Sequence, residues 1–397
     1  APAMTTVPVP PGPTVLDALA LAAEAVDELV VGIARDTHLA VARRIDRTVT
    51  RVLGRTAAVP TALHTGIART VYGGLGLGLR ATARGLGRWA RTGAGTPLEA
   101  SAGGRFVRSA VNGLIGDQLV DDHPRLALTM TVRAPGVGDV DVRDAAAVAV
   151  AYPAATGRVA VLLHGLCENE SYWERARDVV GTTYPAAFAA KGWTPVLLRA
   201  NTGLGVRANG VALSSLLQDL VDHWPVPVER ITLVGHSMGG LVMRAAGAVA
   251  TDAADPWTQR VSDVVTLGTP HLGAPIARGI GHGSTGLGWL PETAPFGRFL
   301  DRRSAGVRDL VAGLTADVAP LPSARYRLVS ATVTRSPRHP VGWLAGDLLV
   351  RERSAYGVEP GGRTLFPGAE RLHLGQAHHF HLLNDPRLHA AFDRWLD

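Results

Sequence analysis

Apolar and polar residues alternate with two different spacings along the chain. In the first part, about residues 14 to 115, apolar residues recur every three or four positions, which places them on one face of a helix. The first such run comprises Leu16, Leu19, Ala23, Val26, Val30 and Ile33. From about residue 125, short apolar runs alternate with helical stretches. That is the pattern of a parallel sheet with crossover helices.

The second part contains several apolar runs that we expect to be strands. They are Leu126–Arg133, Ala146–Tyr152, Val159–Leu163, Pro195–Leu198, Ile231–Val234, Val261–Leu267, Tyr326–Val333 and Arg371–Leu374. The helices expected among them are Glu170–Val180, Gly210–His223, Met238–Thr251 and Pro386–Leu396. The fold class is therefore α/β, with a mostly parallel sheet and flanking helices, preceded by a helical extension.

Arginines in the helical part recur at intervals that place them on one helix face. The two sets are Arg43, Arg47, Arg51 and Arg55, and Arg80, Arg84, Arg88 and Arg91. They are either the solvated side of packed helices or a surface for anionic lipid headgroups. The glycine-rich segment 73–78 follows no strand and precedes no Lys-Ser/Thr pair, so it is not a phosphate loop. It indicates close helix packing or a break.

Composition excludes several classes of protein. The 397 residues are 46% hydrophobic and 19% charged, which is incompatible with a mainly disordered chain. The net charge is +6, yet Lys191 is the single lysine among 40 basic residues. We attribute this arginine bias to the base composition of the gene and expect no nucleic-acid partner. Aromatic residues, at 5%, are also too few to form base-stacking platforms.

Neither cysteine content nor a targeting segment fixes the compartment. Cys167 is the only cysteine, so the chain forms no intramolecular disulfide. The sequence contains no uncharged run of about 20 apolar residues, so it predicts no transmembrane helix. Residues 1–13 are rich in proline and lack the positive start of a signal peptide. The localisation stays open between the cytoplasm and a mature secreted form.

The strongest chemical signal is a serine between a strand and a helix. The run Ile231 to Gly240 reads Ile-Thr-Leu-Val-Gly-His-Ser-Met-Gly-Gly, an apolar strand that leads into G-x-S-x-G. In this motif the serine occupies a tight, strained turn that exposes its hydroxyl at the edge of the sheet. The following helix points its positive end at the same place. We therefore expect Ser237 to be a nucleophile.

A serine hydroxyl needs a base, and the base needs a carboxylate that orients it. In this topology the acid and then the histidine follow the serine. Asp347 lies in a glycine-containing loop beyond the strand 326–333, where the acid is expected. Near the C-terminus, His378, His379 and His381 compete for the role of base. We favour His379, which stands in H-x-x-L-L ahead of the last helix, and His381 has the next claim.

Two backbone N–H groups are candidates for an oxyanion hole. The strand Val159–Leu163 ends in His164-Gly-Leu-Cys, at the same edge as the nucleophile. The N–H groups of Leu166 and Met238 can together hold the negative oxygen of a tetrahedral intermediate. The histidine cluster could instead bind a metal, but no carboxylate or cysteine stands at ligand spacing in its loop. We expect no metal site.

These motifs resemble the α/β-hydrolase superfamily, in particular its lipase-like branch with the GPI inositol-deacylase-like esterases. The resemblance rests on His164-Gly-Leu, Gly235-His-Ser-Met-Gly-Gly, Leu267-Gly-Thr-Pro-His-Leu-Gly-Ala-Pro, Gly346-Asp-Leu-Leu-Val and His379-Phe-His-Leu-Leu. It covers about residues 145 to 397. Leu348 stands where the commoner pattern has glycine. The resemblance implies an α/β-hydrolase fold and a cap after the G-T-P-H block.

The sequence thus predicts three segments: a terminus at 1–13, a helical extension at 14–120 and a catalytic domain at 121–397. Within the last, residues 274–323 are a candidate cap or lid. Its apolar residues Leu287, Trp289, Leu290 and Phe296 are candidate substrate contacts.

The expected function is hydrolysis of a small-molecule or lipid carboxylic ester with an apolar acyl group, through an acyl-enzyme. No cofactor is required. One alternative is an acyltransferase of the same fold. The other is a lipid-surface binding protein with a vestigial site, because the arginine-striped helices offer a membrane contact. The sequence leaves the oligomeric state open.

Overall fold

The computed structural model of the chain describes residues 12–32, 35, 36, 39, 58–274, 304–314, 317–339, 347 and 349–396. Contacts divide the chain into two compact units. The described part of the first unit runs to Arg108 and includes His123–Leu126. The second unit contains Ser109–Asp122 and the described residues from Ala127 onward. The division lies within helix α4 (Ala102–Asp122), and the predicted boundary at residue 120 stays a prediction.

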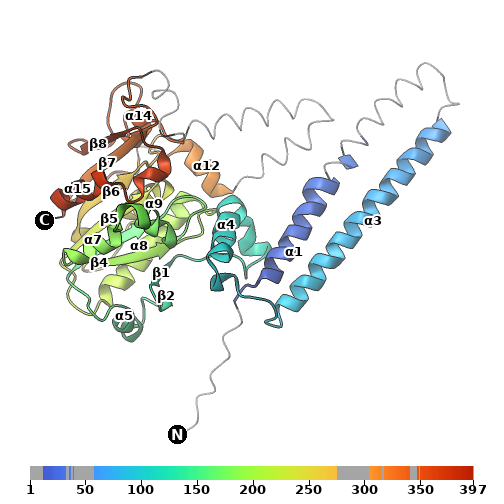
Figure 1. The fold of residues 1–397 in the computed structure, drawn as a ribbon, viewed down its shortest axis with the longest axis horizontal. Coiled ribbons are helices and arrows are strands. Elements are labelled where there is room, and N and C mark those ends of the chain that lie inside the picture. Colours follow the sequence, from blue (N-terminus) through green and yellow to red (C-terminus); the bar gives the residue numbers. More distant parts are fainter. Residues whose placement is uncertain are drawn as a thin grey trace, which may run out of the picture. The chain divides into compact units, whose positions relative to one another are not determined.

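The first unit is helical. Its elements before α4 are α1 (Val15–Ala25), the π-helix η1 (Val26–Gly32), α3 (Ala58–Ala90) and the short 3-10 helix η3 (Leu98–Ala100). The polar N-terminus of α1 is closed by a capping box, in which the Thr14 N–H donates to the carboxylate of Asp17 over 2.8 Å. Helices α1 and α3 lie side by side (Figure 1).

Helix α3 runs unbroken through the glycine-rich segment. A side chain at Gly76 would come within 2.5 Å of the Asp27 carboxylate, so this glycine permits close packing against η1. Arg80 pairs with the same carboxylate over 2.6 Å. The other arginines of this stripe, Arg84, Arg88 and Arg91, are exposed. The predicted stripe from Arg43 to Arg55 lies outside the described residues. Membrane contact by these stripes stays a prediction.

The second unit is built on an eight-stranded sheet of order β2-β1-β4-β3-β5-β6-β7-β8. The strands are β1 (Thr131–Ala134), β2 (Gly138–Val140), β3 (Arg158–Leu163), β4 (Thr194–Arg199), β5 (Arg230–His236), β6 (Val261–Leu267), β7 (Arg325–Thr332) and β8 (Glu370–Gly375). Strand β1 is antiparallel to β2 and β4, and the pairs from β4 to β8 are parallel. The six later runs predicted as strands are therefore confirmed.

Helices cover both faces of this sheet. The described helices after α4 are α5 (Ala145–Ala151), α6 (Arg177–Val180), α7 (Tyr184–Ala190), α8 (Val206–Asp222), α9 (Met238–Gly247), α12 (Ala305–Ala312), α14 (Glu352–Ala355) and α15 (Pro386–Trp395). Residues of α8 and α9 lie in one core, and residues of α7 and α15 lie in the other. Short 3-10 turns are η4 (Glu170–Glu174), η5 (Trp257–Arg260) and η6 (His379–Leu382).

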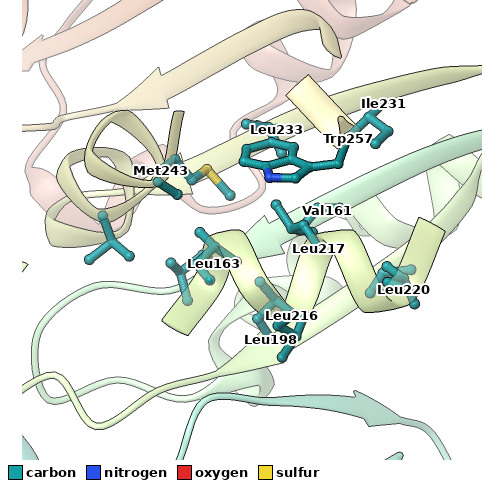
Figure 2. Packing of buried hydrophobic residues seen from close by; sticks show 14 of the residues in the cluster. Val161, Leu163, Leu198, Leu216, Leu217, Leu220, Ile231, Leu233, Met243 and Trp257 are labelled. Carbon is teal, nitrogen blue, oxygen red and sulfur yellow. The ribbon is translucent and has the colours of Figure 1, made fainter. Parts of the chain in front are cut away.

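The side chains of β3 alternate between two apolar cores. Val161 and Leu163 pack with Leu217 of α8 and residues of α9, as Figure 2 shows for the α8 side. Leu162 faces the other way, into a core that includes Phe188 of α7 and residues of α15. Because parallel strands are covered on both faces, their sequences read as continuous apolar runs.

Two predictions for this unit were wrong. The run Ala146–Tyr152 is helix α5 and not a strand, because Asp144 caps it by accepting the Ala146 N–H and alanine favours helix. The helix expected at Glu170–Val180 is interrupted at Ala176, whose φ is 59°. The first predicted strand, Leu126–Arg133, is shorter than expected and is represented by β1.

Candidate active site

Ser237 lies between β5 and α9 in strained backbone geometry. Its φ of 51° and ψ of −120° are rarely adopted by a residue with a side chain. Its N–H donates to the Leu267 carbonyl at the end of β6 over 2.8 Å, and that bond holds the turn against the sheet. The residue is buried, with 7% of its surface exposed. This is the strand-turn-helix context that the G-x-S-x-G motif predicts.

The glycines of the motif permit two close approaches. A side chain on Gly239 would come within 2.4 Å of the Leu163 carbonyl oxygen, at the end of β3. A side chain on Gly235 would come within 2.5 Å of the Gly240 nitrogen. Any larger residue at either position would therefore move α9 away from the sheet.

Asp347 and His379 form a buried pair. The Nδ1–H of His379 donates to Oδ2 of Asp347 over 2.7 Å, and both side chains are almost fully buried. The other carboxylate oxygen accepts the backbone N–H groups of Leu349 and Val350 over 3.0 and 2.7 Å. The His379 N–H also donates to the Asp347 carbonyl over 3.0 Å. Side chain and backbone thus fix the imidazole in one orientation.

The environment of His379 favours its charged form. Burial lowers the pKa of this imidazole, but the charge and the hydrogen bond of Asp347, helped by the charge of Glu168, outweigh burial and raise the pKa above 6.5. A histidine whose Nδ1–H is held by a carboxylate presents Nε2 as a proton acceptor. The pair is therefore arranged to accept a proton and to stabilise the resulting imidazolium.

Several contacts tie His379 to the strand ends that hold Ser237. Gly268 follows Leu267, the residue that accepts the Ser237 N–H, and a side chain on Gly268 would meet the His379 ring at 3.0 Å. The ring of His236, next to the serine in sequence, lies 4.7 Å from the His379 ring between centroids. The structure therefore brings Ser237, His379 and Asp347 to one edge of the sheet.

The other two candidate bases have different surroundings. The rings of His378 and His381 stack 3.5 Å apart. The His378 N–H donates to Nδ1 of His381, and the Phe380 N–H donates to Nδ1 of His378, both over 3.2 Å. They thus cap the turn η6 that carries His379. Within the described residues, Asp347 contacts only His379 of the three histidine side chains.

The loop after β3 carries one of the two candidate oxyanion donors. The Gly165 N–H donates to Glu168 over 2.7 Å, and the Cys167 N–H donates to Thr202 over 3.1 Å. Neither the Leu166 N–H nor the Met238 N–H has a hydrogen-bond partner in the part of the chain that the structure describes. Both N–H groups therefore remain candidate donors to a negative oxygen.

The loop lies against the serine. A side chain on Gly165 would come within 2.9 Å of the Cβ atom of Ser237. Cys167 is partly buried beside this loop, and burial raises the pKa of its thiol to about 11. It is therefore not an activated thiol.

Two further residues of this region were missed at the level of sequence. Glu168 and His236 are buried, and their side chains lie 2.9 Å apart beside the loop and the serine. His236 occupies a variable position of G-x-S-x-G, and Glu168 stands four residues after His164 outside any motif. Neither position indicates a functional residue in the sequence alone. Only the fold brings them together.

Some predicted residues cannot be placed. Leu287, Trp289, Leu290 and Phe296 lie outside the described residues, as does most of the candidate cap at 274–323. Among the residues that are described, no group of three or more His, Cys, Asp or Glu side chains could hold a metal ion. No helix in this same part is long and apolar enough to cross a bilayer.

Comparison with known proteins identifies the fold. Residues 213–283 match the family described as "PGAP1-like alpha/beta domain". No curated protein sequence matches the chain. Together with the strand order, the family match shows that the second unit has the α/β-hydrolase fold.

Similar solved structures include the mature lipase BlEst2 of Bacillus licheniformis. It is 19% identical, with a TM-score of 0.41 over 60% of this chain and 91% of that chain. The carboxylesterase CesB of Bacillus subtilis is 15% identical, with a TM-score of 0.36 over 67% and 85% of the two chains. The activities in these descriptions are those of the named proteins.

Proposed function

We propose that the protein is a serine carboxylic-ester hydrolase that forms an acyl-enzyme with substrates carrying an apolar acyl group. The observation that supports this most is the buried Asp347–His379 pair at the sheet edge where Ser237 occupies its strained turn. A carboxylate, an imidazole and a strained serine are the groups that nucleophilic acyl transfer requires.

In the proposed reaction, His379 accepts the proton of Ser237 while the serine oxygen attacks the ester carbonyl. Asp347 holds Nδ1–H, so Nε2 is the nitrogen that accepts the proton. The charge of Asp347 then stabilises the imidazolium. This agrees with the raised pKa of His379, because the effect of Asp347 on that pKa exceeds the opposing effect of burial. The imidazolium returns its proton to the leaving alkoxide, and the alcohol departs.

The negative oxygen of the tetrahedral intermediate is assigned to the N–H groups of Leu166 and Met238. Both N–H groups lack a partner in the described structure, and Met238 opens helix α9, whose positive end favours an anion. Water activated by His379 then attacks the acyl-enzyme and releases the acid. Every step uses side chains and backbone groups of this chain, so the proposal needs no cofactor.

A series of p-nitrophenyl esters from acetate to palmitate, with emulsified triglyceride beside it, tests this proposal. We expect the purified chain to hydrolyse members of this series, and their relative rates give its acyl-chain preference. Ser237→Ala should reduce kcat by up to about 10⁶-fold. Hydrolysis retained by this variant, or no hydrolysis of any ester by the wild type, would contradict the proposal. A product that depends on an added alcohol would instead indicate an acyltransferase.

A further inference from the structure

His236, the residue before the candidate nucleophile, joins two segments that are distant in sequence. Its ring is fully buried. Its Nδ1 lies 2.9 Å from Oε2 of Glu168, and its Nε2 lies 3.3 Å from the backbone carbonyl oxygen of His379. The same Glu168 oxygen accepts the Gly165 N–H over 2.7 Å. One imidazole therefore links the loop after β3 with the turn that carries the candidate base.

The hydrogen-bond partners of His236 determine how many protons its ring carries. A carboxylate oxygen and a backbone carbonyl oxygen can only accept hydrogen bonds. With Glu168 ionised, both ring nitrogens of His236 face acceptors, which is the hydrogen-bonding pattern of an imidazolium.

A second buried histidine nearby provides the contrast. His164 receives the Ala200 N–H at Nε2 and donates from Nδ1 to the Gly165 carbonyl oxygen. One nitrogen accepts and the other donates, so this ring is neutral. Burial, the largest influence, lowers the pKa of His164. The two histidines next to this loop therefore differ in the kind of partner that their ring nitrogens meet.

The carboxylate of Glu168 is suited to pair with a charged ring. Burial alone would raise the pKa of this carboxyl, but the charge and hydrogen bond of His236 and the Gly165 N–H hold it below its usual value. A buried charge without a partner is strongly unfavourable, whereas a paired and hydrogen-bonded one is tolerated.

We infer that Glu168 and His236 form a buried ion pair that positions the oxyanion loop and the His379 turn around Ser237. Glu168 fixes Gly165, directly before the candidate oxyanion donor Leu166. His236 fixes the backbone of His379. Both are positioning residues, because they act through Gly165 and His379. This role rests on the proposed function, but the charge of the pair does not.

The charge of the pair is tested without any activity measurement. In NMR spectra of the full chain with ¹⁵N-labelled histidine rings, His236 should show two ring N–H signals and His164 one. The variant His236→Gln assigns the first set. In Glu168→Gln, which keeps the shape of the side chain and removes its charge, His236 should lose one N–H signal. A single N–H on His236 in the wild type would overturn the ion pair.

The positioning role is tested by kinetics with a matched control. Glu170→Gln removes the charge of a second partly buried acid in the same segment, one that pairs with Arg199 and does not contact Gly165 or His236. We expect Glu168→Gln to lower kcat by about 10²-fold with KM little changed, because a small displacement of catalytic groups has an effect of that size. Glu170→Gln also weakens a buried ion pair, the one with Arg199, and should therefore destabilise the fold as Glu168→Gln does. The kcat of its folded fraction should stay close to that of the wild type, because Glu170 hydrogen-bonds to neither Gly165 nor His236. Equal effects of the two variants would overturn the role.

A second variant guards against a general loss of structure. His236→Asn retains an N–H donor toward Glu168 but cannot reach the His379 carbonyl. We expect it to melt close to the wild type and still to lose kcat, whereas unchanged kcat would overturn the link to His379. A wild type that hydrolyses no ester would contradict the proposed function, and the NMR spectra would still decide the ion pair.

Discussion

Strand β3 and helix α3 both contain apolar side chains, and they bury them to different degrees. In β3 the residues Val159–Leu163 are at most 1% exposed. In α3, Ala83 and Ala90 are buried, while Leu77 and Trp89 are 63% and 59% exposed. A strand covered on both faces depends on its neighbours at every position, whereas a helix forms all its backbone hydrogen bonds internally. Strand β3 therefore depends on tertiary packing at every position, whereas α3 completes its backbone hydrogen bonds alone and leaves large apolar side chains exposed.

The glycines of the two units show the same contrast. In α3, a side chain at Gly74, Gly78 or Gly85 would meet no atom within 4 Å. In the turn around Ser237, a side chain at Gly239 would overlap the backbone of β3. Glycine is required where backbones approach closely, and it weakens a helix where nothing approaches. Glycine therefore has a structural role at Gly239 and at Gly76, and it weakens the helix at open positions such as Gly78.

If ester hydrolysis depends on the second unit alone, the variant expected to lose the most activity is the one that lacks the base, His379. His379→Ala should lower kcat by between about 10⁴-fold and 10⁶-fold, because Ser237 then has no proton acceptor. His381→Ala, which removes only a cap of the turn, should retain a substantial part of the activity. Arg84→Ala in α3 should leave kcat unchanged. Ester hydrolysis by the three purified variants checks this. An inactive His381→Ala with an active His379→Ala would move the base by two residues.

The difference in packing predicts different losses of stability. Leu162→Ala should lower the free energy of unfolding by about 2–5 kcal/mol, because it leaves a cavity in a fully buried core. Leu77→Ala, at an exposed position of α3, should change it by no more than about 0.5 kcal/mol. Urea titrations of both variants measure these changes. Losses of equal size would show that α3 is packed as tightly as the strand.

The pH dependence of activity should reflect the raised pKa of His379. The base must be neutral to accept a proton, so kcat/KM should fall as the pH drops through a value above 6.5. Asp347→Asn removes the charge that favours the imidazolium and should move this limb to lower pH. For stability the sign is opposite. The raised pKa stabilises the fold below pH 6.5, and this contribution is lost as pH rises through the folded value. If the acidic limb of the kcat/KM profile stayed at the same pH in Asp347→Asn, the pairing of Asp347 with His379 would be contradicted.

The smallest effects concern the glycines of α3. Gly78→Ala should stabilise the chain by about 0.5–1 kcal/mol, because alanine favours helix and meets open space. Gly76→Ala should gain less, because its side chain must displace the carboxylate of Asp27 and disturb the pair with Arg80. Thermal melting of the two variants gives the comparison. A larger gain at Gly76 would show that α3 and η1 are not in close contact.

Much of the second unit can be predicted from sequence because the information is local. The strands read as apolar runs, and the turn at Ser237 is defined by its own neighbours and glycines. The prediction of a strand at Ala146–Tyr152 was wrong, because a run of alanine and valine does not distinguish strand from helix without its cap at Asp144. The pairing of His379 with Asp347 followed from chain order. The choice among the histidines required the turn η6, whose geometry depends on tertiary contacts.

The remaining features depend on contacts between distant residues. Glu168 and His236 are 68 positions apart and meet only when β3 and β5 pair. The length of α3 was also hidden, because its glycines indicate a break when read alone. In the structure, Gly76 packs against Asp27 of another helix and α3 continues. Residues whose partners lie on other elements cannot be recognised from the pattern around them.

The nucleophile is the central claim, and covalent labelling tests it most directly. A fluorophosphonate should phosphonylate the wild-type chain once, and peptide mapping by mass spectrometry should place the adduct on Ser237. Labelling should be absent in Ser237→Ala and strongly slowed in His379→Ala, because the base activates the hydroxyl. An adduct on another residue, or a labelled Ser237→Ala chain, would contradict the assignment of Ser237 and with it the proposed acyl-enzyme.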